Sequence, residues 1–385
     1  MSGVPGARLE QPFDLLEHWA ISTPERPYFV DGTHELSFAQ AYEHARKLAT
    51  ALRALGVQEG EVVALELSSA LQVLFIPALM QLRAATVIHR ESGPVHANWL
   101  FSSNRTSSER ARRTVPVDGA FLRDVAEHAE LRESLPYPSR ASLLRLAHSS
   151  GSTGTPKAIP LTLEMAHHRA LAANELAVPG QPFMSLLDMG TASGFHTYLG
   201  GLLRGEAFYN PGNAAHNLAL LSRYRVSALK LSPIQLSELL AEAERTGTPL
   251  DGLTALYCAG SVVPVALRQR VRSLGGIRLY CLYGSTEAGR CAERELLDDD
   301  TANVGQIAEG TELRIVDEAG NDVPAGQSGH VRYRRAHQAV EYFEDPFATE
   351  AAFVDGWFLT GDIGHISPRG ELILDGRSNE VMNVG

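Results

Sequence analysis

The chain has few cysteines, no excess of positive charge and no long apolar run, and each lack argues against a class of protein. Its three cysteines, Cys258, Cys281 and Cys291, form no CxxC pair, so we expect buried small residues in a reducing cytosol rather than disulfides or zinc ligands. The net charge of −11 has no offsetting basic cluster, which argues against binding nucleic acid or an anionic membrane. No segment resembles a signal peptide or reaches the roughly 18 consecutive apolar residues of a membrane span. These features predict a soluble cytoplasmic protein.

What the chain does contain is typical of an α/β protein. Apolar residues make up 44% of it and aromatic residues 7%. A chain of 385 residues exceeds what one hydrophobic core usually serves, so two or three subdomains are expected. Residues 38–55 carry apolar side chains at helical spacing and stop at Gly56. A strand at 61–67 followed by a helix at 70–82 forms a βα unit, which favours a parallel sheet covered by helices.

A second cycle of strands and helices is expected between residues 182 and 290. The strands are predicted at 184–187, 228–231, 255–258 and 279–282, and the helices at 232–246 and 264–274. From Asn303 the pattern changes to short alternating segments separated by turn residues, which is typical of a small antiparallel β subdomain. The arginines between Arg105 and Arg113 are expected to lie on a solvated helix face rather than in a nucleic-acid patch.

The most informative segment is His-Ser-Ser-Gly-Ser-Thr-Gly-Thr-Pro-Lys at residues 148–157, which follows an apolar run. A strand that leads into a glycine- and hydroxyl-rich turn can direct N–H and hydroxyl groups into one concavity, which binds a phosphate chain. Lys157 would add a point charge for the β or γ phosphate. The spacing is not that of the common nucleotide P-loop. The alternative is a flexible linker, and the return to an apolar segment at 159–162 disfavours it.

Residues 149–157 resemble the phosphate loop of the adenylate-forming superfamily, which holds acyl- and aryl-CoA synthetases, peptide-synthetase adenylation domains and firefly luciferase. Further segments resemble that family's motifs in the same order, at 283–289 (Tyr-Gly-Ser-Thr-Glu-Ala-Gly), 303–306, 312–321, 326–329, 356–362 (Gly-Trp-Phe-Leu-Thr-Gly-Asp) and 375–377 (Asp-Gly-Arg). The segments 36–42 and 52–57 resemble its first helix. The resemblance therefore covers the chain from about residue 15 to its last residue.

The resemblance implies an α/β fold of two helix-covered, mostly parallel β-sheet subdomains packed together, plus a small antiparallel β-barrel-like subdomain. The expected parts are an α/β subdomain with the acyl and adenine sites (10–60 and 182–300), an α/β subdomain with the phosphate loop (61–181), the small β subdomain (301–377) and the start of a hinge (378–385, with Asn379 at the hinge position).

Two departures from the family stand out. Residues 85–140 are short and rich in Arg and Ser, where relatives carry a second regular βα pair. The chain ends at Gly385, inside the hinge motif, so the family's C-terminal lid domain with its catalytic lysine is expected to be absent, in an excised fragment or in a natural minimal form.

The reaction implied by the resemblance is attack of a substrate carboxylate on the α-phosphate of Mg·ATP, which gives an acyl-adenylate and pyrophosphate. A thioester with CoA or with carrier-protein phosphopantetheine would follow. Lys157, Thr286 and Glu287 are the implied catalytic residues, with Thr286 at the α-phosphate and Glu287 as the Mg²⁺ ligand. The implied phosphate cradle consists of Ser149, Ser150, Gly151, Ser152, Thr153 and Gly154. The alternative for Glu287 is an exposed strand-end carboxylate.

For the nucleoside, the resemblance implies that Tyr283 stacks on adenine and that Asp362 and Arg377 hold the ribose hydroxyls. The remaining implied nucleotide contacts are Ala259, Gly260 and Ser261 on the other face of the base, with Gly284 and Ser285 in the tyrosine motif. The alternatives are a core tyrosine for Tyr283, a turn residue for Asp362 and a surface pair with Asp375 for Arg377.

The implied acid pocket comprises Met189, Gly190, Thr191, Gly194, His196, Leu282 and Gly289. No carboxylate lies between Gly190 and Ala192 to grip an ammonium group, which disfavours an α-amino acid. The small residues leave a roomy apolar slot that suits an aryl or medium-sized acyl acid. His196 could reach this slot or be a packed helix histidine. The expected partners are that acid and an acyl or aryl carrier protein, with the oligomeric state left open.

A second hypothesis is an ATP- or acyl-AMP-binding homologue with impaired catalysis. The intact set of Lys157, Thr286, Glu287, Asp362 and Arg377 favours the enzyme, because a decayed copy is expected to lose some of these residues.

Overall fold

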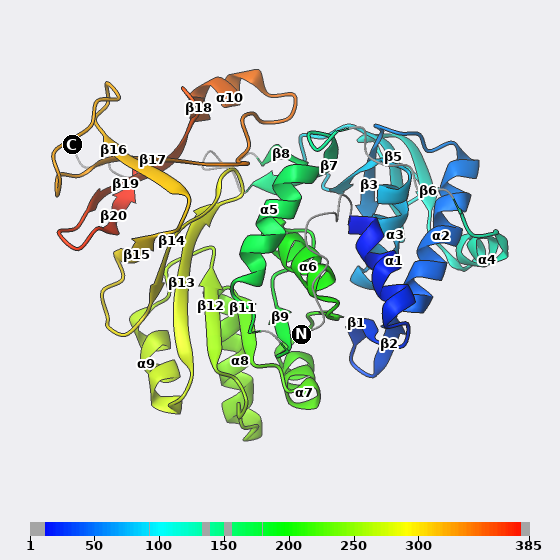
Figure 1. Ribbon diagram of the computed structural model, residues 1–385, viewed down its shortest axis with the longest axis horizontal. Helices are drawn as coiled ribbons and strands as arrows, with labels where there is room; N and C mark the ends of the chain where they lie inside the picture. Colours follow the sequence, from blue (N-terminus) through cyan, green and yellow to red (C-terminus); the bar gives the residue numbers. More distant parts are fainter. Residues whose placement is uncertain (1–11, 92, 133–138, 150–155, 179, 379–385) are drawn as a thin grey trace. The chain divides into compact units, whose positions relative to one another are not determined.

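The computed structural model describes residues 12–378 apart from residues 92, 133–138, 150–155 and 179 (Figure 1). Its contacts group the chain into two compact units. The first unit comprises the described parts of Met1–Ser149, Pro156–Leu176 and Asp188–Pro211. The second comprises the described parts of Ala177–Leu187 and Gly212–Gly385.

The first unit contains a six-stranded sheet in the order β6-β5-β3-β4-β7-β8. All neighbouring pairs are parallel except β7 and β8, which pair antiparallel. The strands are β3 (Val62–Glu66), β4 (Ala85–Ile88), β5 (Ala97–Ser102), β6 (Ala111–Pro116), β7 (Leu143–Ser149) and β8 (Lys157–Thr162). A smaller sheet has the order β10-β1-β2, with β1 (Pro27–Asp31), β2 (His34–Ser37) and β10 (Phe208–Tyr209).

The helices of this unit are α1 (Pro12–Ser22), α2 (Phe38–Leu55), α3 (Ser69–Gln81), α4 (Gly119–Glu127), α5 (Leu163–Asn174) and α6 (Ala192–Arg204). The helix predicted at 38–55 is confirmed, and its ends show why. Ser37 and Gln40 form a reciprocal capping box at its start, and Gly56 closes it in the left-handed conformation with φ of 99°.

The second unit is built on an 11-stranded sheet with the order β16-β17-β19-β20-β15-β14-β13-β12-β11-β9, in which β18 pairs with β19. Its parallel strands are β9 (Phe183–Ser185), β11 (Ala228–Leu231), β12 (Ala255–Ala259) and β13 (Arg278–Ser285). The antiparallel strands are β14 (Gly289–Glu295), β15 (Asn303–Ile307), β16 (Thr311–Val316), β17 (Gly329–Arg335), β18 (Phe353–Val354), β19 (Trp357–Ile366) and β20 (Glu371–Arg377). The helices are α7 (Ala214–Tyr224), α8 (Pro233–Thr246), α9 (Val265–Leu274) and α10 (Pro346–Ala352).

The parallel part of this sheet has two chemically different faces. Leu229, Leu256 and Cys258 are almost completely buried. Burial raises the pKa of the Cys281 thiol, and Arg268 of α9 is close enough to offset part of that rise. Cys281 therefore lies on the side of α9. Side chains alternate along a strand, so Tyr280 points to the opposite face.

The structure differs from the sequence-based expectation at the arginine-rich segment. The prediction of a solvated helix face at Arg105–Arg113 is wrong. Residues 111–116 form β6, which pairs in parallel with β5 at the edge of the sheet. Arg105 instead binds Glu66 and Glu91, with nitrogen–oxygen distances of 2.6 Å to each. The Arg113 guanidinium lies 4.8 Å from the centre of the Trp99 ring. An edge strand with one solvated side tolerates such charges, and periodicity alone does not distinguish it from a helix face.

The grouping of segments also differs from the predicted subdomains. Residues 10–60 were expected beside 182–300, but their described part belongs to the first unit, where α1 and α2 pack with α3. The antiparallel strands from β15 onward continue the large sheet, because β15 pairs with both β14 and β20. A hydrophobic cluster that includes Ala292, Val304, Val331, Tyr333, Phe358 and Leu372 runs under this part. Among the described residues, no helix has the length and apolar character needed to cross a bilayer.

Candidate functional site

The two described ends of the predicted phosphate loop lie side by side in the first unit. Ser149 ends β7 and is buried, and its Cα partner across the antiparallel pair is Lys157, which begins β8. The intervening predicted residues, Ser150, Gly151, Ser152, Thr153 and Gly154, lie outside the described residues. The strand pair therefore fixes where the segment leaves and re-enters the sheet.

In the second unit, Thr286 and Glu287 lie in the turn of the β13–β14 hairpin. Gly284 allows the two strands to approach closely, because a Cβ atom there would lie 2.3 Å from the carbonyl oxygen of Gly289. The Ser285 hydroxyl accepts a hydrogen bond from the Ala288 N–H at 3.0 Å and shares another with the Tyr333 hydroxyl at 2.9 Å. The hairpin turn is thus held by side chains from β13 and β17.

Glu287 is buried, with 7% of its surface exposed. Its carboxylate accepts a hydrogen bond from the Tyr342 hydroxyl at 2.9 Å, and its carbonyl accepts one from the Ala339 N–H at 2.9 Å. Burial and the neighbouring carboxylate raise the pKa of Tyr342, so this phenol stays a donor. The alternative of an exposed strand-end carboxylate is therefore wrong. A buried carboxylate oxygen held in place suits a hard divalent cation.

The predicted ribose pair is brought together on β19 and β20. Asp362 is buried and is the Cα partner of Arg377, whose Nε lies 3.0 Å from Asp362 Oδ1. The Tyr283 hydroxyl donates to Asp362 Oδ2 at 2.5 Å. Burial and the carboxylate raise the pKa of Tyr283. The alternative pair of Arg377 with Asp375 is not formed, because Asp375 binds Ser328 and His365 instead.

The predicted adenine segment follows β12. Ala259 is the last residue of that strand and the Cα partner of Leu282 on β13, next to Tyr283. Gly260 has a φ of 96°, a conformation that favours glycine, and it turns the chain away at this point. The parallel pairing of β12 with β13 ends here, at the carboxyl edge of the parallel strands, where open α/β sheets bind ligands. Ser261 follows in the turn and is exposed.

The predicted acid-pocket residues of the first unit form the start of α6. Thr191 caps the helix, with its hydroxyl accepting from the Gly194 N–H at 3.0 Å. The Gly190 N–H donates to Asp188 Oδ1 at 2.6 Å. Met189 is fully buried, and its carbonyl accepts from Arg145 Nη2 at 3.1 Å. Arg145 was not predicted from the sequence, although an arginine in the apolar run 141–147 could have indicated it.

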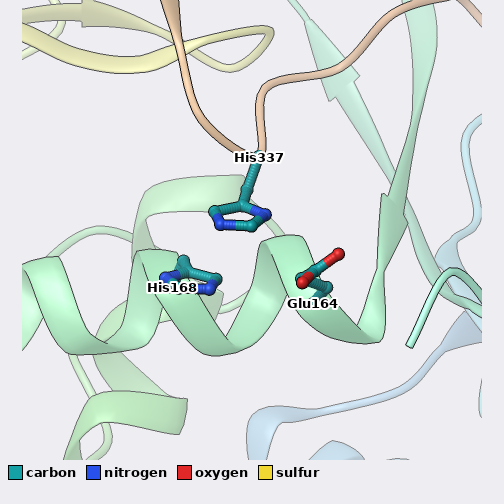
Figure 2. Close-up of side chains that lie close together, drawn as sticks. All are labelled: Glu164, His168 and His337. Atoms are coloured by element: carbon teal, nitrogen blue, oxygen red, sulfur yellow. The ribbon is translucent and has the colours of Figure 1, made fainter. Parts of the chain in front are cut away.

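His196 is buried in α6, with its ring centre 6.1 Å from that of Phe195, which agrees with the alternative of a packed helix histidine. The other predicted pocket residues, Leu282 and Gly289, belong to β13 and β14 of the second unit. On α5, Glu164 and His168 lie one turn apart on the same side of the helix (Figure 2). Two ligands from one helix do not complete a metal centre, so this pair supports no assignment by itself.

Sequence reasoning missed three residues of the second unit that contact or neighbour the predicted site. Tyr333 and Tyr342 bind Ser285 and Glu287, and neither belongs to a recognisable motif. Lys230 lies within the apolar strand β11, and a single lysine among Ala228, Leu229 and Leu231 is a signal that the sequence did contain.

Comparison with known proteins is consistent with this arrangement. The model of the AMP-binding enzyme family matches residues 16–88 and 78–343. The chain is 28% identical to a 2-hydroxy-7-methoxy-5-methyl-1-naphthoate–CoA ligase of Streptomyces carzinostaticus, over 95% of this chain and 75% of that protein. It is 23% identical to the 2-succinylbenzoate–CoA ligase of Bacillus subtilis, over 98% of this chain and 80% of that protein.

Solved structures show the same fold. The O-succinylbenzoate coenzyme A synthetase of Bacillus subtilis in complex with ATP and a magnesium ion superposes with a TM-score of 0.84 at 21% identity, covering 96% of this chain and 81% of that one. The anthranilate CoA ligase AuaEII in complex with anthranoyl-AMP gives a TM-score of 0.84 at 24% identity, covering 96% of this chain and 77% of that one.

Proposed function

Because this chain belongs to the AMP-binding enzyme family, we propose that it activates a carboxylic acid with ATP, forming an acyl- or aryl-adenylate and pyrophosphate. Transfer of the acyl group from the adenylate to a thiol follows, with release of AMP, which makes the chain an acid–thiol ligase. CoA is the proposed acceptor, because the relatives are named as CoA ligases. The phosphopantetheine thiol of an acyl or aryl carrier protein is the alternative acceptor.

The observation that carries this proposal is the arrangement around Asp362. Its buried carboxylate is fixed from two sides, by the Tyr283 hydroxyl and the Arg377 guanidinium. A ribose diol requires an acceptor and a rigid donor close together, and this pair supplies both. We propose that Asp362 and Arg377 hold the ribose hydroxyls and that Tyr283 stacks on the adenine, with residues 259–261 on its other face and Gly284 and Ser285 beside it.

Catalysis requires two anions, the acid and the triphosphate, to meet in line. Lys157 and residues 149–154 are proposed to bind the β and γ phosphates, and Thr286 the α-phosphate. Glu287 is proposed as the ligand of Mg²⁺, which its buried carboxylate oxygens fit. When bound, the ion neutralises part of the phosphate charge. Tyr342 keeps the carboxylate of Glu287 oriented.

The proposed acid is aromatic or a medium-sized acyl acid rather than an α-amino acid. Asp188, the carboxylate beside the start of α6, accepts a hydrogen bond from the Gly190 N–H and lies close enough to the buried Arg145 to offset its charge, so its negative charge is already matched by a cation of the protein. The names of the relatives support the same class, since they act on a naphthoate, a succinylbenzoate and a chlorobenzoate.

We further propose that the reaction takes place in the cytoplasm, where the free cysteines Cys258, Cys281 and Cys291 stay reduced. The hinge role of Asn379, which lies outside the described residues, stays a prediction.

The test is pyrophosphate exchange into ATP with a panel of aryl, acyl and amino acids, together with calorimetric binding of AMP. Asp362→Ala should weaken AMP binding by at least about tenfold, since it removes a charge-assisted contact. Asp375→Ala is the matched control, because that carboxylate lies on β20 near the site but binds Ser328 and His365. Binding of AMP without exchange for any acid would favour the impaired homologue. No nucleotide binding at millimolar concentration would refute the proposal.

A further inference from the structure

Lys230 occupies an unusual position for a lysine, in the middle of a buried strand. It is 9% exposed, and the other three residues of β11 are apolar and buried. Its Cα partners are Ser185 on β9 and Tyr257 on β12, and Tyr257 pairs in turn with Tyr280 on β13. Residues in register on parallel strands share a face, so these side chains form a row on the face opposite α9.

The ammonium group of Lys230 is not neutralised by its surroundings in the described part of the chain. It makes no hydrogen bond or ion pair there, and Ser185, the polar neighbour in register, is engaged with the backbone of Leu187. The charged group that affects it most is Arg290, a second cation. Burial and this like charge lower the pKa of Lys230 to about 8. Buried charges are usually paired, so a missing partner requires an explanation.

Arg290 lies on the same face, because its Cα partner is Gly284, four residues beyond Tyr280 on β13. Its own charge is offset by Glu293, with Nη1 and Oε2 2.8 Å apart. The same face carries Leu282, which the sequence assigned to the acid pocket. Tyr257 and Tyr280 stack with ring centres 5.0 Å apart and an angle of 18°, so they place a pair of aromatic rings in the same row as Lys230. Aromatic rings beside a buried cation match an aromatic acid that carries a second acidic group.

We propose that Lys230, with Arg290 beside it, determines acid specificity by binding a second anionic oxygen group on the substrate. The acid would then carry an additional carboxylate or acidic hydroxyl besides the carboxylate that is activated. The inference rests on the proposed function, since it deepens the identity of the acid at the same site. The substrate's second anion would supply the counter-charge that the described residues do not give to Lys230.

The test compares each aromatic dicarboxylate with its monomethyl ester, which keeps the shape and removes one charge. A second arm compares a nitro-substituted hydroxybenzoate, whose hydroxyl is ionised at pH 7, with its methyl ether, and so tests the hydroxyl as the source of the second anion. The variants are Lys230→Met, Lys230→Arg and the control Lys47→Met, because Lys47 is paired with Glu43 on α2 in the first unit. Binding is measured by calorimetry at pH 7, and adenylate formation by pyrophosphate release.

The wild type should bind at least one acidic acid about tenfold or more tightly than its neutral counterpart, and K230M should lose that preference. K230R should retain part of it, and K47M all of it. Equal binding of charged and neutral acids by the wild type, or an unchanged preference in K230M, would overturn the inference. Adenylate formation only from acids without a second anionic group would support the proposed function and refute the proposed role of Lys230. Absence of any adenylate would refute the function, while calorimetry would still decide whether Lys230 binds the anion.

Discussion

The buried charge of Lys230 should make the stability of the protein depend on pH in a way that one substitution removes. Burial and the neighbouring Arg290 lower the pKa of Lys230 from 10.5 to about 8. A shift of one pKa unit corresponds to about 1.4 kcal/mol, so keeping this lysine protonated in the folded state costs on the order of 3 kcal/mol. The cost is the difference between two protonation equilibria and does not depend on any ligand.

The sign follows from which state binds the proton more tightly. Between about pH 8 and pH 10.5 the unfolded chain keeps the proton of Lys230 and the folded chain has lost it, so stability rises with pH across this window. Below about pH 8 both states are protonated and the full penalty applies. Lys230→Met removes the penalty at every pH and keeps a similar side-chain volume.

The assay is urea unfolding of the wild type and K230M at several pH values from 7 to 10.5. K230M should be more stable at pH 7 by up to about 3 kcal/mol, and the difference should shrink as the pH rises. The charged and titratable groups on the same face, which are Arg278, Arg290, Glu293, Glu295, Tyr257 and Tyr280, are present in both proteins, so their contributions largely cancel in the difference. A difference that stays constant between pH 7 and 10.5, or a less stable K230M at pH 7, would show that the lysine is neutralised by a partner and refute the reasoning.

Three further substitutions test the second unit. Glu287→Gln should lower the magnesium-dependent part of ATP binding by about tenfold or more in calorimetry, because a neutral amide is a poorer ligand for a hard cation; an unchanged magnesium dependence would remove Glu287 from the metal site. Tyr342→Phe removes the hydrogen bond to Glu287 but leaves the carboxylate, so the magnesium dependence of ATP binding should persist. Urea unfolding should show a free energy of unfolding lower by about 1–2 kcal/mol. Gly284→Ala should destabilise the protein by roughly 3 kcal/mol or prevent folding, because its Cβ would overlap the Gly289 carbonyl; wild-type stability would show that the hairpin can widen.

Enlarging Gly190, one of the small residues of the predicted acid slot, would not be a clean test of the size of that slot. A Cβ there would lie 2.6 Å from Asp188 Oδ1 and 3.2 Å from Ile88 Cγ1, so a larger residue disturbs the turn before α6 first. The sequence gives the small residue, but only the packed neighbours show why it is small.

The sequence by itself determined the local elements and the order of the motifs. The helix at Phe38–Leu55 and the strand at Ala228–Leu231 were predictable, because caps and apolar spacing act within a few residues. The positions of Tyr283, Asp362 and Arg377 were predictable from motifs, because each motif is a short local pattern. The edge strand β6 was not, since its polar alternation is ambiguous until a neighbouring strand supplies hydrogen bonds.

Only the tertiary structure decided which of these residues meet. Asp362 and Tyr283 are 79 positions apart, and Glu287 and Tyr342 are 55 apart, so no local pattern links either pair. The isolation of Lys230 likewise depends on what β9, β12 and β14 place around it, namely a serine engaged elsewhere, a tyrosine and a second cation. Burial and charge pairing depend on neighbours that come from distant segments of the chain. The sequence therefore shows only a lysine in a strand, whereas the fold shows a buried charge that the described residues do not pair.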